Sequence, residues 1–409
     1  MSPPNEAPTE ETSIDRPVVA AIELGDWEGL GNDKVRLELS PRRTVLVGRN
    51  GAGKSLLLAG IFRASQEAWL APRSRAETPR YFRCDIRRPL QSFSYEFQKY
   101  ENDEDEDETE TTASSETSVS VPPRVQIQKW TERCWLSEAG TDLWRVANGM
   151  LTVAEEEPVQ ISPGIGMLAT MDSRSTRLPE AALVWSMLIG FALIPAGVPR
   201  NDPAHRRDVY VRSSRNPSQR RWMRSAGGGR IESLAYTLAF FADTRRELFD
   251  EFAALARQLR LADTVDVRIY EDPAPRGEER RDFASVMFDG VNIGLLSDGT
   301  LRISELLVDL IRRVGSVVLV EEPETGVHPG LLSRLLQVVD SYALDRQIVI
   351  STHSPIVVDW CQWDELRLVE RRDTRTTVRG LTKTESTQIK NYLDDEGLLS
   401  DFIYSQSEE

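Results

Sequence analysis

The stretch Gly48-Arg49-Asn50-Gly51-Ala52-Gly53-Lys54-Ser55 follows a short β-rich run, Thr44–Val47, and opens an apolar helical pattern over Leu56–Leu70. Its spacing is G-x-x-x-x-G-K-[ST], the phosphate-binding loop, in the strand–loop–helix context that this motif requires. The glycines let successive backbone N–H groups point at phosphate oxygens, and the helix N-terminus adds partial positive charge. We expect all eight residues to bind ATP, with Lys54 on the β- and γ-phosphates and Ser55 on Mg²⁺.

A second motif is the apolar run Val317–Val320, which ends in Glu321, Glu322 and Pro323. So apolar a run is typical of a strand buried on both faces, and its C-terminal end is where α/β sheets place their ligands. Adjacent strand residues point to opposite sides, so the two acids can have different tasks. We expect Glu321 to hold Mg²⁺, directly or through water, and Glu322 to orient and deprotonate the attacking water.

Two shorter segments complete the set. Leu296-Ser297-Asp298-Gly299-Thr300 opens a helix that Ser297 can cap, and Gly299 allows an anion to approach its N-terminus closely. Ser351-Thr352-His353-Ser354-Pro355 follows the next expected strand, Ile348–Ser351, so His353 lies on the same edge of the sheet. Together the ordered motifs predict that Lys54, Glu322 and His353 act in catalysis.

This order of motifs resembles the ABC-type ATPases of the SMC, RecF and OLD group, and more closely the prokaryotic AAA family ATPases found in defence and toxin-like gene pairs. The resemblance covers mainly residues 17–60 and 290–358. It implies a homodimer in which two subunits pack head to tail, so that Ser297 and Gly299 of one contact the γ-phosphate held by the other. It also implies that Glu324 and Thr325 communicate across the dimer and that His353 contacts the γ-phosphate.

The resemblance implies an α/β, ABC-ATPase (P-loop NTPase) fold with a mixed sheet, a β-rich first lobe and a helical insertion. We expect one ATPase lobe over 17–160 and a second, with the last three motifs, over 264–385. Between them we expect a helical insertion over 165–262, and at the ends a disordered tail over 1–16 and a helical tail over 386–409. Asp298 and Thr300 replace the glycine and glutamine of transporter subunits, which argues against a transporter.

Composition limits the remaining possibilities. The formal net charge is −15 over 409 residues, which argues against nucleic-acid binding by the whole surface. Three cysteines without metal-ligand spacing, and an N-terminus without a signal peptide, favour the cytoplasm. The long uncharged stretch 181–198 fits a buried helix better than a membrane span, so we expect no membrane contact. The short stretch from His353 to Glu409 leads us to expect no TOPRIM nuclease domain of the kind that OLD proteins carry.

Two charged segments stand out. From Glu101 to Glu110 eight of ten residues are acidic, and a Ser/Thr run follows, so we expect 101–123 to be a disordered insertion, either a solvated loop or an acidic recognition arm. From Arg206 to Arg230 there are eight arginines and one acid, with Tyr210 and Trp222 among them. Such a patch fits DNA or RNA, with Arg212, Arg220, Arg221 and Arg224 as contacts, but equally a solvated face or a partner for the acidic insertion.

We therefore expect Mg²⁺-dependent hydrolysis of ATP that gates a protein effector encoded nearby, a nuclease or toxin, in defence against phage. One alternative is an ATP-gated scaffold with negligible turnover. Another is a RecF-like DNA repair ATPase, in which charge reversal at Arg220, Arg221 and Arg224 should abolish DNA-stimulated turnover. Gln91 and Gln98 are candidates for sensing Mg²⁺, and Trp27 is a candidate for stacking on adenine.

Overall fold

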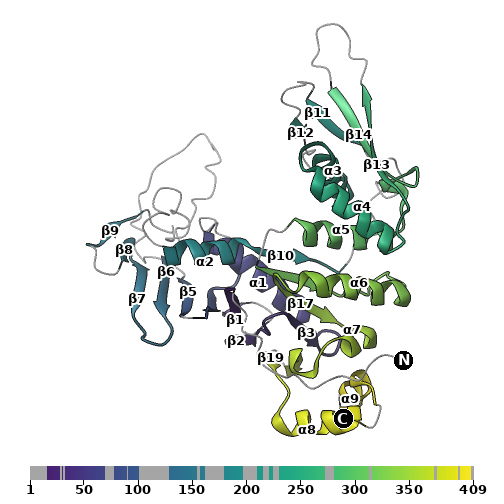
Figure 1. Ribbon diagram of the computed structural model, residues 1–409. Helices are drawn as coiled ribbons and strands as arrows, with labels where there is room; N and C mark the ends of the chain where they lie inside the picture. The colour runs from purple at the N-terminus through teal and green to yellow at the C-terminus, as the bar shows by residue number, and fades with distance from the viewer. Residues whose placement is uncertain are drawn as a thin grey trace, which may run out of the picture.

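The computed structural model describes residues 16–27, 30, 33–69, 78–89, 91–100, 129–153, 157–161, 179–196, 210–214, 221–223, 230–271, 281–312, 316–372, 375–394 and 397–406. The expected acidic insertion 101–123 lies outside these residues, as does the expected tail 1–16 apart from Arg16. The described strands form three sheets, and helices pack between and around them (Figure 1).

The central sheet has six strands in the order β10-β16-β17-β3-β18-β19. These are β10 (Phe191–Ile194), β16 (Val317–Glu321), β17 (Gln347–Thr352), β3 (Arg43–Val47), β18 (Leu366–Arg372) and β19 (Arg375–Arg379). Each neighbouring pair is parallel except β18 and β19, which are antiparallel. Parallel strands end at the same edge of a sheet, so the segments that follow β3, β16 and β17 lie together there. The expected mixed α/β sheet is confirmed.

Both faces of this sheet are buried, which explains its continuous apolar runs. Alternate residues divide between two hydrophobic clusters: Val318 and Ile350 belong to one, and Leu319 and Val349 to the other. The first cluster lies under α5 (Asp298–Ile311), α6 (Pro329–Tyr342) and α7 (Pro355–Trp360); the second lies under α1 (Lys54–Trp69) and α2 (Pro179–Ile189). Burial of each of these aliphatic side chains stabilises the fold by roughly 1.5–3 kcal/mol relative to exposure to water. The packed core therefore holds in place the sheet edge that carries the site.

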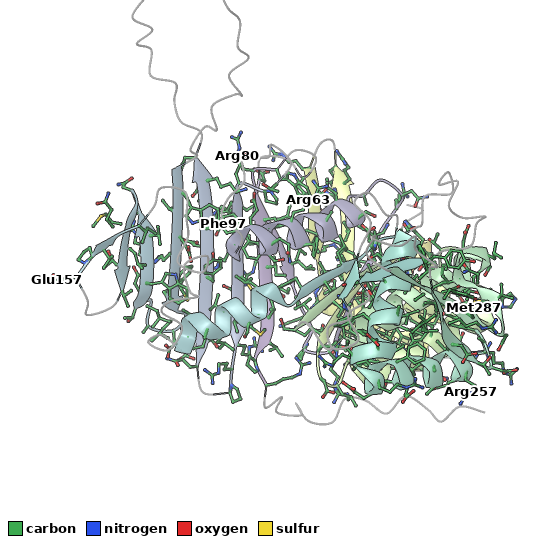
Figure 2. The ribbon with its side chains drawn as sticks, turned by 90° about the horizontal axis from the view of Figure 1, so that it is seen from above. Arg63, Arg80, Phe97, Glu157, Arg257 and Met287 are labelled. Atoms are coloured by element: carbon green, nitrogen blue, oxygen red, sulfur yellow. The ribbon has the colours of Figure 1, made fainter. Side chains whose placement is uncertain are left out.

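The first lobe is an eight-stranded sheet in the order β2-β1-β4-β5-β6-β7-β8-β9, with every pairing antiparallel. Its strands are β1 (Val18–Gly25), β2 (Val35–Glu38), β4 (Tyr81–Arg87), β5 (Ser92–Tyr100), β6 (Lys129–Leu136), β7 (Asp142–Ala147), β8 (Met150–Val153) and β9 (Val159–Gln160). Figure 2 shows α1, with Arg63, lying across this sheet. The β-rich first lobe is therefore confirmed.

The segment expected to be helical, 165–262, contains three strands as well as helices. The long apolar stretch 181–198 is not one helix: α2 ends at Ile189, and after Gly190 the run Phe191–Ile194 becomes β10, which pairs with β16 of the central sheet. A four-residue apolar run fits a helix or a buried strand equally well by periodicity. Here an available parallel neighbour decides for the strand.

Further strands in the same segment form part of the third sheet. Its order is β12-β11-β14-β13, with β15 also pairing with β14. The elements are β11 (Val211–Ser214), β12 (Arg221–Met223), α3 (Arg230–Thr244), α4 (Arg246–Gln258), β13 (Val265–Glu271), β14 (Arg281–Phe288) and β15 (Val291–Asn292), and we call them the arm. Figure 2 shows Met287 and Arg257 of the arm and Glu157 of the first lobe at opposite ends of the molecule.

The last described elements are the short 3₁₀ helices η3 (Ile293–Leu295) and η4 (Trp363–Glu365) and the helices α8 (Lys383–Asp394) and α9 (Leu399–Gln406). α9 packs on α7, and both the backbone N–H and the hydroxyl of Ser400 donate to the Asp359 carboxylate. Within the described part of the chain, every helix is too short or too polar to span a bilayer.

Candidate nucleotide site

Three of the expected site residues meet at one edge of the central sheet. Lys54 begins α1 after β3, Glu322 follows β16, and His353 follows β17. The Lys54 Nζ lies 2.7 Å from His353 Nε2, and His353 Nε2 lies 3.6 Å from Glu322 Oε1. Residues separated by some 300 positions along the chain therefore surround a single point.

The phosphate loop is shaped by its glycines. Gly51 has φ +80° and Gly53 has φ +101°, in the left-handed region that glycine enters without a steric penalty. At Gly48 the constraint is space, because a Cβ there would lie 2.1 Å from the backbone oxygen of Val369 on β18. At Gly53 a Cβ would lie 2.6 Å from Thr376 Oγ1 on β19, and that hydroxyl donates to the Ala52 carbonyl (3.2 Å). The β18–β19 hairpin thus braces the loop.

Lys54 turns back onto its own loop. Its Nζ donates to the carbonyl oxygens of Gly48 (2.8 Å) and Arg49 (3.3 Å). Burial lowers the pKa of Lys54 to about 8, while the nearby carboxylates of Glu322 and Glu324 oppose that shift. Burial and the Lys54 charge also lower the pKa of His353. An ammonium has only hydrogens to offer, so a neutral imidazole accepts from Lys54 through Nε2.

Glu322 leaves the strand in a conformation that is unusual for a residue with a side chain. Its φ is +39°, while its N–H donates to the Ser351 carbonyl (2.8 Å) and its Oε2 accepts from the Thr325 hydroxyl (3.2 Å). A left-handed non-glycine residue costs about 1–2 kcal/mol, and such strain is found chiefly at functional sites. The bend brings the carboxylate next to His353.

Glu321 has different neighbours, as expected for adjacent acids with different tasks. Its Oε2 accepts from the Ala196 N–H (2.9 Å), just beyond β10, and its backbone carbonyl accepts from the Arg302 guanidinium. Burial raises the pKa of Glu321, opposed by hydrogen bonds that include one from the Ser55 side chain. Ser55 and Glu321 therefore present one hydroxyl and one carboxylate together, a donor set suited to Mg²⁺, which typically keeps several waters and binds substrate phosphates. No group of three or more His, Cys, Asp or Glu within the described ranges is arranged to hold a metal on its own.

Ser297 and Gly299 lie at the exposed N-terminus of α5. Ser297 Oγ accepts from the Thr300 N–H (3.2 Å), so it caps the helix as expected. A Cβ on Gly299 would lie 2.4 Å from the backbone oxygen of Gly326, so this helix end packs against the turn that follows Glu322. The start of α5, with Ser297 and Gly299, therefore contacts the turn that follows Glu322 within one chain.

The remaining candidates have mixed outcomes. Arg212 and Arg221 lie on β11 and β12, whereas Arg220 and Arg224 lie outside the described residues. Tyr210 and Tyr270 of the arm are exposed and form an edge-on pair, 6.0 Å between ring centroids. Trp27 is buried against Gly60 of α1, so the suggestion that it stacks on adenine is wrong. Gln91 lies just before β5 and Gln98 lies within it, so both belong to the first lobe, and their role in sensing Mg²⁺ stays a prediction.

Sequence reasoning missed Val369 and Thr376, which brace the phosphate loop. Nothing near them in the sequence resembles a motif, because Val369 acts through its backbone oxygen and Thr376 through one hydroxyl contact. It also missed Arg302 of α5, although its place five residues after Ser297 was visible.

Comparison with known proteins bears on the second half of this site. Residues 213–359 match the family model described as "AAA domain, putative AbiEii toxin, Type IV TA system". The match includes Ser297, Glu321, Glu322 and His353 and begins after the phosphate loop. The OLD nuclease of Thermus scotoductus is 32% identical over 107 residues, which cover 25% of this chain and 20% of that nuclease. The chain thus spans about a fifth of the length of this curated relative.

Among solved structures, an SMC head bound to the C-winged helix domain of ScpA has a TM-score of 0.44 and 14% identity, covering 91% of this chain and 99% of that one. The ATP-binding subunit of an ABC transporter has a TM-score of 0.41 and 13% identity, covering 95% and 99%. The fold assignment itself rests on the strand order and the phosphate loop described above.

The motifs, the family match over residues 213–359 and the similarity to an OLD nuclease together support the resemblance to SMC/OLD-type ATPases seen in the sequence. Residues 213–359 carry an AAA domain of the kind that the AbiEii family model describes.

Proposed function

We propose that this chain binds ATP with Mg²⁺ at the phosphate loop and hydrolyses it to ADP and phosphate. The observation that carries the proposal is the convergence of Lys54, Glu322 and His353 on one point at the sheet edge, with Ser55 and Glu321 adjacent. Ion pairs that only stabilise a fold also bring charges together. These residues, however, lie beside a glycine-rich loop at the N-terminus of a helix, which is a site suited to binding a triphosphate.

Each residue then has a task that its position supports. The loop N–H groups and Lys54 hold the β- and γ-phosphates, and Lys54 exchanges its loop carbonyls for phosphate oxygens. Glu322 orients the attacking water and takes its proton. Once Lys54 has turned from His353 to the phosphates, the neutral His353 ring can carry its proton on Nε2 and donate it to the γ-phosphate. Ser55 and Glu321 hold Mg²⁺, which supplies charge neutralisation at the β- and γ-oxygens.

We further propose that two chains complete two sites as a homodimer. The exposed α5 N-terminus of one subunit, with Ser297 and Gly299, would face the γ-phosphate held by the other. An isologous arrangement of this kind uses the same two surfaces twice and closes on itself. This arrangement would explain why Ser297 and Gly299 lie at a helix N-terminus that is exposed in the single chain.

The biological part of the proposal is that ATP binding and hydrolysis gate a protein effector, a nuclease or toxin encoded nearby, in cytoplasmic defence against phage. It is supported by the similarity of residues 213–359 to an AAA domain of a toxin–antitoxin family. Contact of Arg212, Arg220, Arg221 and Arg224 with DNA or RNA stays a prediction.

Glu322→Gln tests the hydrolysis and separates it from an ATP-gated scaffold. The amide cannot take a proton from water, so kcat should fall by roughly 10²-fold to 10⁴-fold, while ATP binding is kept and the ATP-bound dimer accumulates. Turnover and mass would be measured by phosphate release and light scattering. As a control, Asp250→Ala removes a surface acid on α4 and should change neither. Wild-type turnover that survives in Glu322→Gln would show that another group is the base.

A further inference from the structure

The turn that follows Glu322, Pro323–Gly326, contains a second carboxylate, Glu324. The family resemblance implies that this turn faces the other subunit. In the structure the Glu324 side chain instead points into its own chain and is half-buried, while Thr325 and Gly326 are exposed. Glu324 therefore has a task within one subunit, whatever the turn contacts outside it.

One oxygen of Glu324 holds the start of the His353 loop. Oε1 accepts from the Thr352 hydroxyl (2.7 Å) and from the backbone N–H of His353 (2.7 Å). The Thr352 hydroxyl in turn accepts from the Ser354 N–H (2.9 Å). Three consecutive residues are thus tied, directly or through one hydroxyl, to a single carboxylate, and hydrogen bonds to a charged group are the stronger kind.

This anchor lies at the base of the His353 side chain. With its backbone N–H fixed, His353 places Nε2 at 2.7 Å from Lys54 and 3.6 Å from Glu322. β17 ends just before this point, at Thr352, so the sheet alone does not fix the loop. Without the carboxylate, the His353 N–H has no other hydrogen-bond acceptor among the described residues.

The other side of Glu324 is closed by the protein. Oε2 is buried and has no hydrogen-bond partner among the described residues. Burial, together with the charges of Glu324 and Asp359, raises the pKa of Tyr404 on α9 to about 12, so the C-terminal helix lies within electrostatic range of this acid. At the end of the same turn, the Gly326 carbonyl contacts Gly299 at the start of α5.

We propose that Glu324 is a positioning residue: in its own subunit it fixes the backbone of His353 and so aims the imidazole at the phosphate position. The turn then connects the start of α5, which Gly326 contacts, with His353, which Glu324 holds. This inference rests on the ATP hydrolysis proposed above, through which its effect on turnover is read.

Two substitutions separate hydrogen bonding from charge. Glu324→Ala removes the acceptor, so kcat for ATP should fall roughly 10-fold to 100-fold, the effect of misplacing a reacting group by about 1 Å. KM should change little, because Lys54 and the loop still hold the phosphates. Glu324→Gln keeps an oxygen that can accept both bonds, and should therefore restore most of kcat. Asp250→Ala, a surface acid on α4, is the matched control.

A double-variant cycle shows whether Glu324 acts through the imidazole. In a His353→Ala background, Glu324→Ala should have no further effect on kcat. A structural role elsewhere predicts a second, independent loss. The cycle is accompanied by thermal unfolding of every variant, so that a simple loss of fold is recognised.

A second readout needs no turnover. The chain has three histidines, so the imidazole NMR signal of His353 is assigned by its absence in His353→Ala. Glu324→Ala should move that signal in the absence of ATP, and Glu324→Gln should leave it near its wild-type position. The proposal is overturned if the signal stays in place in Glu324→Ala, if kcat is unchanged, or if the loss persists without His353. If the wild type shows no turnover at all, the proposed function fails and the NMR signal alone decides the role of Glu324.

Discussion

Lys54 is the residue whose environment most restricts the chemistry. It is a cation buried at the end of a sheet, held by two carbonyls and an imidazole, with its pKa lowered to about 8. At neutral pH it is mostly charged, as a phosphate ligand must be. One or two units higher, a large part of the protein without nucleotide carries a neutral amine there.

The affinity for ATP should therefore depend on pH. Phosphate oxygens favour the charged form, so binding raises the Lys54 pKa and takes up a proton above pH 8. The Kd for Mg·ATP should rise about tenfold per unit between pH 8.5 and 9.5, in line with the linkage of one proton. Lys54→Arg stays charged in this range, and its Kd, although weaker throughout, should lose that slope. A wild-type Kd that is flat to pH 9.5 would contradict the prediction; titration calorimetry measures both.

The sequence predicted the meeting of Lys54, Glu322 and His353 because each follows an apolar run, and parallel strands end together. It did not predict what Glu324 does. A carboxylate in a turn gives no periodic signal, and its partner, a backbone N–H, belongs to every residue. Trp27 was misplaced for a related reason: aromatic residues beside glycines occur both in binding loops and, as here, packed on a helix.

At the scale of elements, the β18–β19 hairpin determines the shape of the phosphate loop. Gly48→Ala would place a methyl group against the Val369 carbonyl, where the backbone of a central strand cannot easily yield. We expect a loss of about 1–3 kcal/mol in the free energy of unfolding, typical of overpacking, and a loss of ATP affinity larger than that of any nearby surface variant.

The matched control is Gly380→Ala, just beyond β19, where a Cβ meets nothing within 4 Å. It should change neither the free energy of unfolding, measured with denaturant, nor nucleotide binding. If Gly48→Ala and Gly380→Ala had the same free energy of unfolding and the same nucleotide affinity, the β18–β19 hairpin would not determine the shape of the phosphate loop.

The elements that the sequence misjudged are the short strands. β10, β11 and β12 hold three or four residues each, and they exist because distant strands offer pairing: β16 for β10 and β14 for β11. Local propensity over so few residues is weaker than such tertiary pairing. The long amphipathic helix α4 and the buried strands β16 and β17, by contrast, carry their pattern in the sequence.

For the whole molecule, the proposed head-to-tail dimer predicts how mixtures of two inactive variants should behave. Lys54→Ala removes the phosphate ligand, and Ser297→Arg places a bulky cation at the exposed α5 terminus; each alone should be nearly inactive. A mixed dimer contains one site with both parts intact. Equal mixing should restore activity to roughly a quarter of wild type, since half of the dimers are mixed and each has one working site.

Phosphate release from the two proteins, separately and mixed, measures this. A mixture as inactive as its components would mean that each chain builds its site alone. The control is a protein that carries both substitutions in the same chain, which should stay inactive because neither site of its dimer has both parts intact.

The strand order of the central sheet also has a consequence during synthesis. Both neighbours of β3, the strands β17 and β18, are made long after β3 itself, so Val45 cannot pair with Ile350 and Leu366 until they have been synthesised. At about 5–20 residues per second, that wait lasts on the order of tens of seconds. A chain that stops before β17 and β18 would carry the phosphate loop without the two strands that flank β3, so the proposed ATP site could not form on it.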